Sequence, residues 1–312
     1  MSAEPVTETD IITTLKSIRD YIRWGASQFA ENKVFLGHGI ATSLHESAAL
    51  VMHALYQPYH LDDCYLGAVL TLDERRKVMH LLERRIKERK PVAYLTNEAI
   101  FAGLSFYVDE RVLVPRSPIA ELIEQRFEPW VDEEQVFNVL DLCTGSACIA
   151  IACAYAFPEA RVDAVELSDD AIAVAQINID KHDVSEQLTI YKSDLFNALP
   201  DNKYDVIVSN PPYVAIQEWK ELPTEYHNEP EMGFTAGVTG LDLVLRILVD
   251  ANDYLTEQGI LIIEVGSSAE TLQQMFPEIP FYWLEFERGG DGVFLLTAEQ
   301  VQQYHKHFKK FI

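Results

Sequence analysis

Two groups of residues have the types and spacing that chemistry requires, and the first is a loop after an apolar, β-rich run. Its sequence, Asp-Leu-Cys-Thr-Gly-Ser-Ala, occupies residues 141–147. A tight turn at glycine allows backbone amides to approach a nucleoside closely. Glu166 ends the next β-rich run, 21 residues after Gly145, where a carboxylate can accept hydrogen bonds from ribose hydroxyls. Asp194 follows the third run and can accept from the exocyclic amine of adenine. The spacing therefore predicts a nucleoside cofactor; a turn of small residues that binds nothing is the alternative.

The second group is Asn210-Pro211-Pro212-Tyr213, directly after the run YDVIVS. Two consecutive prolines end the hydrogen bonding of a sheet and stiffen the backbone. The Asn210 side-chain oxygen and a neighbouring carbonyl can accept both N–H bonds of a planar NH2 group, which directs the face of its nitrogen toward an electrophile. Tyr213 can stack on the same flat group. The motif predicts a site for a reacting amide or amine nitrogen; a plain proline turn is the alternative.

The elements that must position these motifs alternate between β-rich and helical runs from about residue 136. Such alternation is typical of a doubly wound, parallel α/β sheet of the Rossmann-like kind, in which the carboxyl ends of the strands meet at one edge. The closing runs FYWLEFE and GVFLLT are separated by residues 288–291 (Arg-Gly-Gly-Asp). A tight turn there predicts that at least one of the last two strands is antiparallel.

The N-terminal part has helical periodicity instead. Apolar residues recur from Ile11 to Ile22, from Leu44 to Leu55 and from Val78 to Ile86, so we expect a small helical domain in residues 1–97. A strand-like stretch with a turn at Asp109-Glu110 predicts a β-hairpin linker in residues 98–116. Residues 117–312 then form the domain that carries both motifs.

Composition narrows the class of protein. Hydrophobic residues make up 48% of the 312 residues, which is typical of a folded protein of about two domains. The formal net charge of −24, from 25 basic and 49 acidic residues, disfavours capture of free nucleic acid. No apolar window of about 18 residues and no signal-peptide pattern are present, so we expect a cytoplasmic protein without a membrane span.

We expect no metal site. The cysteines are Cys64, Cys143, Cys148 and Cys153. Their spacing is not that of metal ligands, and we interpret them as small buried hydrophobic side chains. His305 and His307 lie in a polar tail without carboxylate or thiolate neighbours.

Taken together, the two motifs resemble those of class I S-adenosylmethionine-dependent methyltransferases that act on amide or amine nitrogen. Residues 91–123 (PVAYLTNEAIFAGLSFYVDERVLVPRSPIAELI) and 283–297 (WLEFERGGDGVFLLT) are similar to the protein N(5)-glutamine methyltransferases. The resemblance covers nearly the whole chain and is to the branch that methylates large-subunit ribosomal protein three. The release-factor branch shares VLVPR and NPPY but not RSPIAEL or the Gly-Gly-Asp-Gly-Val turn.

The resemblance implies a role for each motif residue. The cofactor loop would be formed by Cys143, Thr144, Gly145, Ser146 and Ala147, with Asp141 beside the methionyl amine. Glu166 would bind the ribose, Asp194 and Leu195 the adenine, and Asn210, Pro211, Pro212 and Tyr213 the target amide. The family usually has glycine at the position of Ala147. If this position requires a positive φ, alanine costs about 1 kcal/mol there.

The resemblance also implies substrate and partners. The expected activity is methyl transfer from S-adenosylmethionine to a glutamine amide of a basic ribosomal protein of the large subunit, with no role for free nucleic acid or a membrane. The alternatives are a release-factor glutamine methyltransferase, an adenine methyltransferase and a non-catalytic ribosome assembly factor. Two features stay open. The basic stretch from Arg75 to Lys90 is either a surface for ribosomal RNA or an acidic partner, or a solvated face. Arg116 either orients substrate or cofactor, or forms a structural salt bridge.

Overall fold

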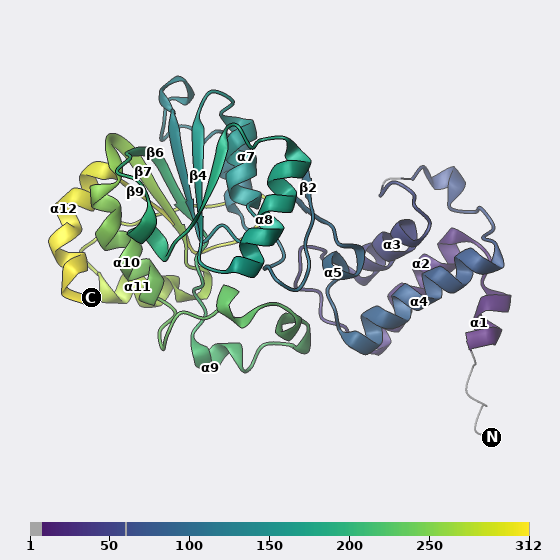
Figure 1. Cartoon of the computed structure of the whole chain (residues 1–312). Coiled ribbons are helices and arrows are strands. Elements are labelled where there is room, and N and C mark those ends of the chain that lie inside the picture. The colour runs from purple at the N-terminus through teal and green to yellow at the C-terminus, as the bar shows by residue number, and fades with distance from the viewer. Residues whose placement is uncertain (1–7, 60, 312) are drawn as a thin grey trace. The chain divides into compact units, whose positions relative to one another are not determined.

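The structure is a computed structural model that describes residues 8–59 and 61–311. The chain divides into two compact units (Figure 1). The first comprises the chain up to Asn97 together with Pro223–Asn228, and the second comprises Glu98–Leu222 and Glu229–Ile312. The sequence pattern did not indicate that residues 223–228 belong to the first unit. Residues 1–7, which we expected in the helical domain, lie outside the described part of the chain.

The first unit is helical, as expected. Its helices are α1 (Glu8–Thr14), α2 (Ile18–Glu31), α3 (Ser43–Ala54), α4 (Leu72–Glu88) and α5 (Val92–Thr96). The apolar period from Ile11 to Ile22 is divided between two helices, α1 and α2. Ser17 caps α2: its side chain accepts from the Asp20 amide while the Asp20 carboxylate accepts from the Ser17 amide. This capping box starts a new helix inside the apolar period.

The basic stretch on α4 is largely paired. Arg85 is fully buried and donates to both carboxylate oxygens of Glu46 at 2.9 and 3.2 Å. Arg75 is also buried and donates to two backbone carbonyls. Exposed members of the stretch form i,i+4 pairs, such as Lys77 with Asp73, and the partly exposed Arg84 pairs with Glu88 in the same way. This pattern agrees with a helix that packs on one face and is solvated on the other.

The segment Pro223–Asn228 joins the first unit through Glu225. This side chain is buried and accepts from the Phe35 amide at 3.0 Å and from Arg89 at 3.3 Å. Arg85 lies 3.7 Å from the same carboxylate. A buried carboxylate requires such partners because desolvation disfavours its charge. Glu225 therefore holds this segment in the helical unit.

The second unit begins with a hairpin whose turn differs from the expected one. Strands β1 (Ala99–Phe101) and β2 (Leu104–Phe106) pair antiparallel. The turn lies at Ala102-Gly103, where both residues have positive φ, the geometry of a two-residue hairpin turn. The chain also turns after Asp109, where the Val112 amide donates to the Asp109 carbonyl at 3.1 Å, but this turn does not join the two paired strands. The hairpin turn predicted at Asp109-Glu110 is therefore wrong in position.

A seven-stranded sheet forms the centre of the second unit. Its strands are β3 (Asn138–Leu142), β4 (Arg161–Glu166), β5 (Leu188–Lys192), β6 (Tyr204–Ser209), β7 (Leu255–Glu264), β8 (Tyr282–Trp283) and β9 (Val293–Thr297). They are ordered β5-β4-β3-β6-β7-β9-β8. The first five in this order pair parallel, whereas β9 is antiparallel to both neighbours. The α/β, Rossmann-like class with antiparallel closing strands is confirmed.

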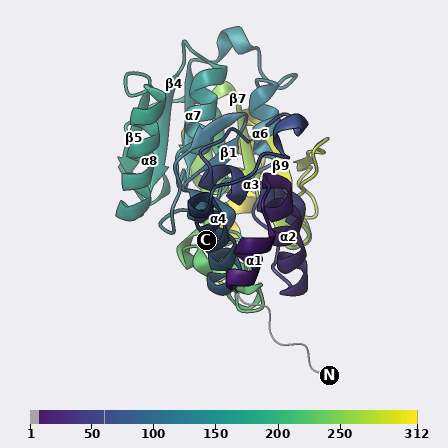
Figure 2. The same cartoon turned by 90° about the vertical axis from the view of Figure 1, so that its right-hand side faces the viewer.

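Helices cover both faces of this sheet (Figure 1, Figure 2). One face packs on α6 (Ile119–Glu124), α7 (Cys148–Ala156) and α8 (Asp169–His182), and the other on α10 (Asp242–Asp250), α11 (Ala269–Met275) and α12 (Ala298–Phe308). The short helix α9 (Ile216–Trp219) follows β6. Alternate residues of a strand point to opposite faces. Val206 and Val208 belong to the hydrophobic core between the sheet and α7, and Ile207 belongs to the core between the sheet and α10.

The cysteines depart in part from expectation. Cys148 and Cys153 are buried in α7, as expected for small hydrophobic side chains. Cys143 is half-buried, and Cys64 is exposed in a short turn that has no buried residue. The prediction that all four are buried is therefore wrong for Cys64. Within the described ranges, no helix combines the length and apolar character needed to cross a membrane.

Candidate active site

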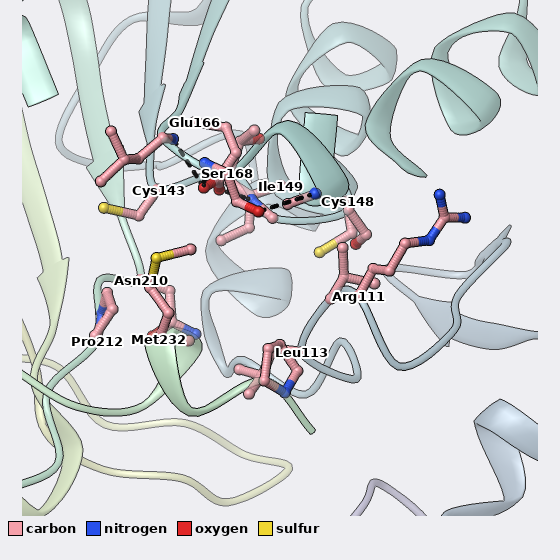
Figure 3. A pocket seen from close by; sticks show the side chains of 18 of the residues that line it. Arg111, Leu113, Cys143, Cys148, Ile149, Glu166, Ser168, Asn210, Pro212 and Met232 are labelled. Atoms are coloured by element: carbon pink, nitrogen blue, oxygen red, sulfur yellow. Dashed lines mark hydrogen bonds between the residues drawn. The ribbon is translucent and has the colours of Figure 1, made fainter. Parts of the chain in front are cut away.

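A cavity of about 410 Å³ lies in the second unit, at the carboxyl ends of β3, β4, β5 and β6. Strands β4 and β6 flank β3, so the chain leaves β3 in one direction and returns on its other side. Ligand crevices of doubly wound sheets form at such switch points. Figure 3 shows Glu166 and Ser168 on one side of the cavity and Asn210 and Pro212 on the other. The two motifs therefore meet at one site.

The loop after β3 adopts the left-handed conformation at its key positions. Gly145 has φ of +55°, and a Cβ built on it would have no atom within 4 Å. Such a Cβ would project into open space beside the cavity, where a ligand could otherwise approach the backbone. Ala147 has φ of +64° and is buried. The condition under which alanine strains this loop is therefore met.

Asp141 lies beneath this loop and is not among the residues that line the cavity. One of its oxygens accepts from the Thr144 hydroxyl at 2.5 Å and from the Ala150 amide at 3.1 Å. Ala147, the N-cap of α7, has no side-chain cap bond, so Asp141 supplies the missing acceptor for the first turn of this helix. Its other oxygen is buried with no partner among the described residues. Burial raises the pKa of Asp141 to about 7.

Glu166 ends β4 and lines the cavity, where the sequence placed it. Its carboxylate accepts from the Gly145 amide at 2.9 Å through one oxygen. The other oxygen accepts from the amides of Leu167 and Ser168. A carboxylate has about four acceptor positions, so Glu166 keeps one for a ligand hydroxyl. The backbone thus fixes this carboxylate at the edge of the sheet.

Asp194 and Leu195 also line the cavity. The Asp194 carboxylate pairs with Arg246 at 2.9 Å, and this pairing raises the pKa of Arg246. The sequence analysis missed Arg246, which lies 52 positions farther along the chain on α10. Leu195 is buried with φ of +52° and presents an apolar surface to the cavity.

The Asn-Pro-Pro-Tyr motif is divided between the cavity wall and its support. Asn210 is half-buried and lines the cavity with Pro212. No described residue hydrogen-bonds to the Asn210 side chain, so its amide group is available to a ligand. Pro211 and Tyr213 are not among the lining residues. The Tyr213 hydroxyl instead donates to Glu264 at 3.1 Å.

The remaining wall comes from residues 110–117 and 230–235. The two segments are joined by Arg116, which donates to both oxygens of Glu229 at 2.8 and 3.0 Å. The Val114 amide also donates to the Glu229 carboxylate, and the Glu229 side chain is fully buried. The Arg116 guanidinium also lies 5.5 Å from the centre of the Phe234 ring. The structure thus places Arg116 in a partly buried bidentate ion pair at the cavity wall.

The residues present fit the expected nucleoside cofactor. Glu166 and Asp194 offer acceptors for a ribose and an exocyclic amine, and Leu195 offers an apolar surface. The open space above Gly145 gives a ligand access to the backbone. Among the residues that the structure describes, no group of three or more His, Cys, Asp or Glu side chains is arranged to hold a metal ion.

Several wall residues had no distinguishing signal in the sequence. Met232 and Leu243 line the cavity, but single apolar residues in a loop or helix look like any others. Ser117 lines it too, inside the stretch RSPIAEL that the sequence analysis singled out only as a mark of the branch. Their roles depend on contacts between segments far apart in the chain.

Comparisons with known proteins show the family of this chain. Residues 127–224 match the methyltransferase small domain family. The chain is 47% identical over 305 residues to a protein of Francisella tularensis subsp. tularensis named ribosomal protein uL3 glutamine methyltransferase, with 97% of each chain covered. A protein of the same name from Xanthomonas campestris pv. campestris is 48% identical over 287 residues, which cover 92% of this chain and 93% of that relative.

A solved structure supports the fold alone. The hMettl16 catalytic domain, in complex with the MAT2A 3′UTR hairpin 6, matches with a TM-score of 0.50 and 19% identity over 74% of this chain and 84% of that chain. The membership expected from the motifs is confirmed by the two full-length relatives. The chain belongs to the family of ribosomal protein uL3 glutamine methyltransferases.

Proposed function

We propose that this protein transfers a methyl group from S-adenosylmethionine to the side-chain amide nitrogen of a glutamine in ribosomal protein uL3. The observation that carries this proposal is the position of Asn210. Its side chain, without a partner among the described residues, lines the same cavity as Gly145 and Glu166. One hydrogen-bond acceptor for an amide group thus lies beside acceptors for a nucleoside cofactor. This arrangement suits transfer of a methyl group from the cofactor to the amide nitrogen.

The cofactor half of the cavity would hold S-adenosylmethionine through Glu166 at the ribose and Asp194 at the adenine. When bound, the cofactor supplies a sulfonium methyl group, which is electrophilic. Asp141 acts indirectly, because its hydrogen bonds to Thr144 and Ala150 keep the loop in shape. Arg246 fixes Asp194 in a similar way through their ion pair.

The target half of the cavity would hold the glutamine amide. An amide nitrogen is a poor nucleophile because its lone pair is delocalised, so orientation supplies most of the acceleration. The Asn210 oxygen and a neighbouring backbone carbonyl accept its two N–H groups. Acceptors fixed in this way also stabilise positive charge that develops on the nitrogen. Among the described residues that line the cavity, no histidine or lysine is present to act as a base, and positioned acceptors make a strong base unnecessary.

The choice of substrate is supported by the relatives and by charge. Two proteins similar over more than nine-tenths of this chain are named for action on uL3. A ribosomal protein that binds RNA is basic, and the net charge of −24 favours its approach. The rival protein substrate is a release factor, because the release-factor branch shares the VLVPR and NPPY motifs.

The test uses the full-length protein, labelled S-adenosylmethionine, and purified unmethylated uL3 or release factor in parallel reactions. We expect one methyl group on a glutamine side chain of uL3, located by mass spectrometry of peptides. Ala substitution of that glutamine should abolish incorporation. Methylation of the release factor alone, or of another type of residue in uL3, would overturn the proposal.

A further inference from the structure

We propose that Glu264 is a positioning residue for this reaction: through the hydroxyl groups of Tyr213 and Ser117 it fixes two segments that form the target side of the cavity. The inference rests on the proposed function and goes beyond it. Glu264 does not line the cavity, so its effect must pass through other residues.

Glu264 is the last residue of β7 and is only 5% exposed. One carboxylate oxygen accepts from the Tyr213 hydroxyl at 3.1 Å, and the other accepts from the Ser117 hydroxyl at 2.5 Å. The register of the sheet explains this placement. Ser209 of β6 pairs with Ile263 of β7, so Glu264 ends its strand level with the start of the Asn-Pro-Pro-Tyr motif.

Each hydroxyl belongs to a segment that forms the cavity wall. Tyr213 follows Asn210 across two prolines, which transmit its position because their φ angles are fixed. Ser117 ends the wall segment 110–117 and follows Arg116 directly. A single buried carboxylate therefore links two wall segments that are about 95 positions apart in the chain.

Tyr213 is held on its other sides as well. A Cβ at Gly266, whose φ is +43°, would lie 2.5 Å from Cε2 of the Tyr213 ring. The Ser268 hydroxyl donates to the Tyr213 carbonyl at 2.8 Å. The amides of Val265 and Gly266 both donate to the Gly292 carbonyl. The Gly-Gly-Asp-Gly-Val turn thus supports the strand end that carries Glu264.

The protonation state of Glu264 matters to this linkage. An ionised carboxylate accepts from both hydroxyls, whereas a protonated one must donate through one oxygen. Burial raises the pKa of Glu264 to about 7, while Ser117, Tyr213 and Arg116 oppose this shift and Asp291 adds to it. These hydroxyl and charged groups are the ones that act on Glu264.

The experiment compares Glu264→Gln, Tyr213→Phe and Ser117→Ala at saturating cofactor and at a pH above the pKa of Glu264. Tyr213→Phe keeps the ring and removes only the hydroxyl. We expect each variant to lower kcat about tenfold, while the cofactor dissociation constant changes by less than about twofold. Tyr213→Phe should have little further effect in the Glu264→Gln background, because the shared partner is already altered.

A matched control is Tyr204→Phe. The buried Tyr204 hydroxyl donates to Asp163 at 2.7 Å at the opposite end of β6, so this variant loses a similar hydrogen bond away from the cavity. It should lower the melting temperature and leave kcat at the wild-type value. Tyr213→Phe and Ser117→Ala keep the test valid if Glu264→Gln does not fold.

Activity within about twofold of wild type in Tyr213→Phe and Ser117→Ala would overturn the inference. So would fully additive effects in the double variant. A second readout separates this failure from failure of the proposed function. The carbon-13 signal of the Tyr213 ring carbon that bears the hydroxyl, assigned by its loss in Tyr213→Phe, should shift as Glu264 titrates and stay constant in Glu264→Gln. This measurement needs no substrate.

Discussion

At the scale of single residues, Asn210 differs from its neighbours in the motif because it lines the cavity with a polar side chain that meets no described partner. We predict that Asn210→Ala keeps cofactor affinity and lowers turnover by about 10²–10³-fold, which corresponds to about 2.7–4 kcal/mol. Calorimetry measures the first quantity and methyl incorporation the second. Turnover within threefold of wild type would contradict the role of Asn210.

Ala147 provides a second prediction at this scale. Its φ of +64° costs an alanine about 1 kcal/mol relative to glycine. Ala147→Gly should therefore bind cofactor equally well or more tightly. Gly145→Val should abolish binding, since a β-branched side chain at φ of +55° would project into the cavity. Calorimetric titration of both variants is the measurement. Weaker binding by the glycine variant would indicate that the methyl group of Ala147 has packing contacts worth more than the strain.

The raised pKa of Glu264 predicts a pH dependence of stability. The ordinary value is 4.5 and the folded value is about 7, with burial as the cause. Between these values the folded state binds a proton that the unfolded state has released, so this group lowers the free energy of unfolding as pH rises. Urea titrations across this range should show a flatter pH dependence for Glu264→Gln than for wild type.

Glu257→Gln is the control for that experiment, because Glu257 lies exposed on the same strand. In Glu257→Gln, the free energy of unfolding should depend on pH as it does in the wild type. Equal slopes for wild type and Glu264→Gln would contradict the prediction. The raised pKa of Asp141 also makes the free energy of unfolding fall as pH rises. The free energy of unfolding of Glu264→Gln should therefore still depend on pH.

The sequence located the site residues at strand ends but not the direction of each side chain. Glu166 and Asn210 line the cavity as expected. Asp141 and Tyr213 support it from behind, since one caps α7 and the other binds Glu264. A motif specifies which residues follow a strand, whereas the partner of a side chain depends on segments that only the tertiary fold brings together.

At the scale of elements, α4 carries two neighbouring arginines in opposite environments. Arg85 is fully buried between Glu46 and Glu225, whereas Arg84 forms a partly exposed i,i+4 pair with Glu88. Arg85→Ala should lower the free energy of unfolding by about 3–5 kcal/mol, because it leaves the buried Glu46 carboxylate without the arginine that pairs with it. Arg84→Ala should cost less than about 1 kcal/mol. Urea titration at neutral pH measures both, and similar losses would contradict the prediction.

Local signals at element boundaries explain which elements could be predicted. The closing antiparallel strands followed from two β-rich runs and a glycine-rich connection, and the structure has them. The break between α1 and α2 was hidden because Leu15 continues the apolar period, while Ser17 starts a new helix. The hairpin turn was misplaced because the chain also turns after Asp109, and the sequence does not show which of the two turns joins paired strands.

At the scale of the whole molecule, net charge predicts the form of the substrate. Free uL3 is expected to be basic, so the methyltransferase, with a net charge of −24, should attract it. In an assembled subunit, the RNA phosphates around uL3 repel the methyltransferase. We predict that free uL3 is methylated about tenfold faster, or more, than the same protein in intact unmethylated subunits. Equal concentrations of the two substrates provide the comparison.

Changing the salt concentration tests whether electrostatic attraction causes the faster methylation of free uL3. Raising the salt concentration from about 0.1 M to about 1 M shortens the Debye length from about 10 Å to about 3 Å. Methylation of free uL3 should slow through its association step, while kcat at saturation changes little. If subunits are methylated as fast as free uL3, the charge argument fails, and the exposed basic residues of α4 become candidates for contact with RNA.

The alternation of strands and helices was enough to predict the main architecture, because each run buries its own apolar face. It was not enough to assign residues 223–228. This segment has no helical or strand period. It joins the helical unit through the buried carboxylate of Glu225, through the Tyr226 ring beside Phe35, and through the Asn228 side-chain amide, which donates to the Arg89 carbonyl. Its membership is a property of tertiary contacts alone.

That membership has a consequence for the order in which the protein folds during synthesis. The helical unit would otherwise be complete once Asn97 had left the ribosome. Arg89 and the Phe35 amide, however, have Glu225 as a partner, and Glu225 is translated more than a hundred residues later. The N-terminal unit therefore reaches its final structure only after most of the nascent chain has emerged, and its last step coincides with delivery of the segment that follows the Asn-Pro-Pro-Tyr motif.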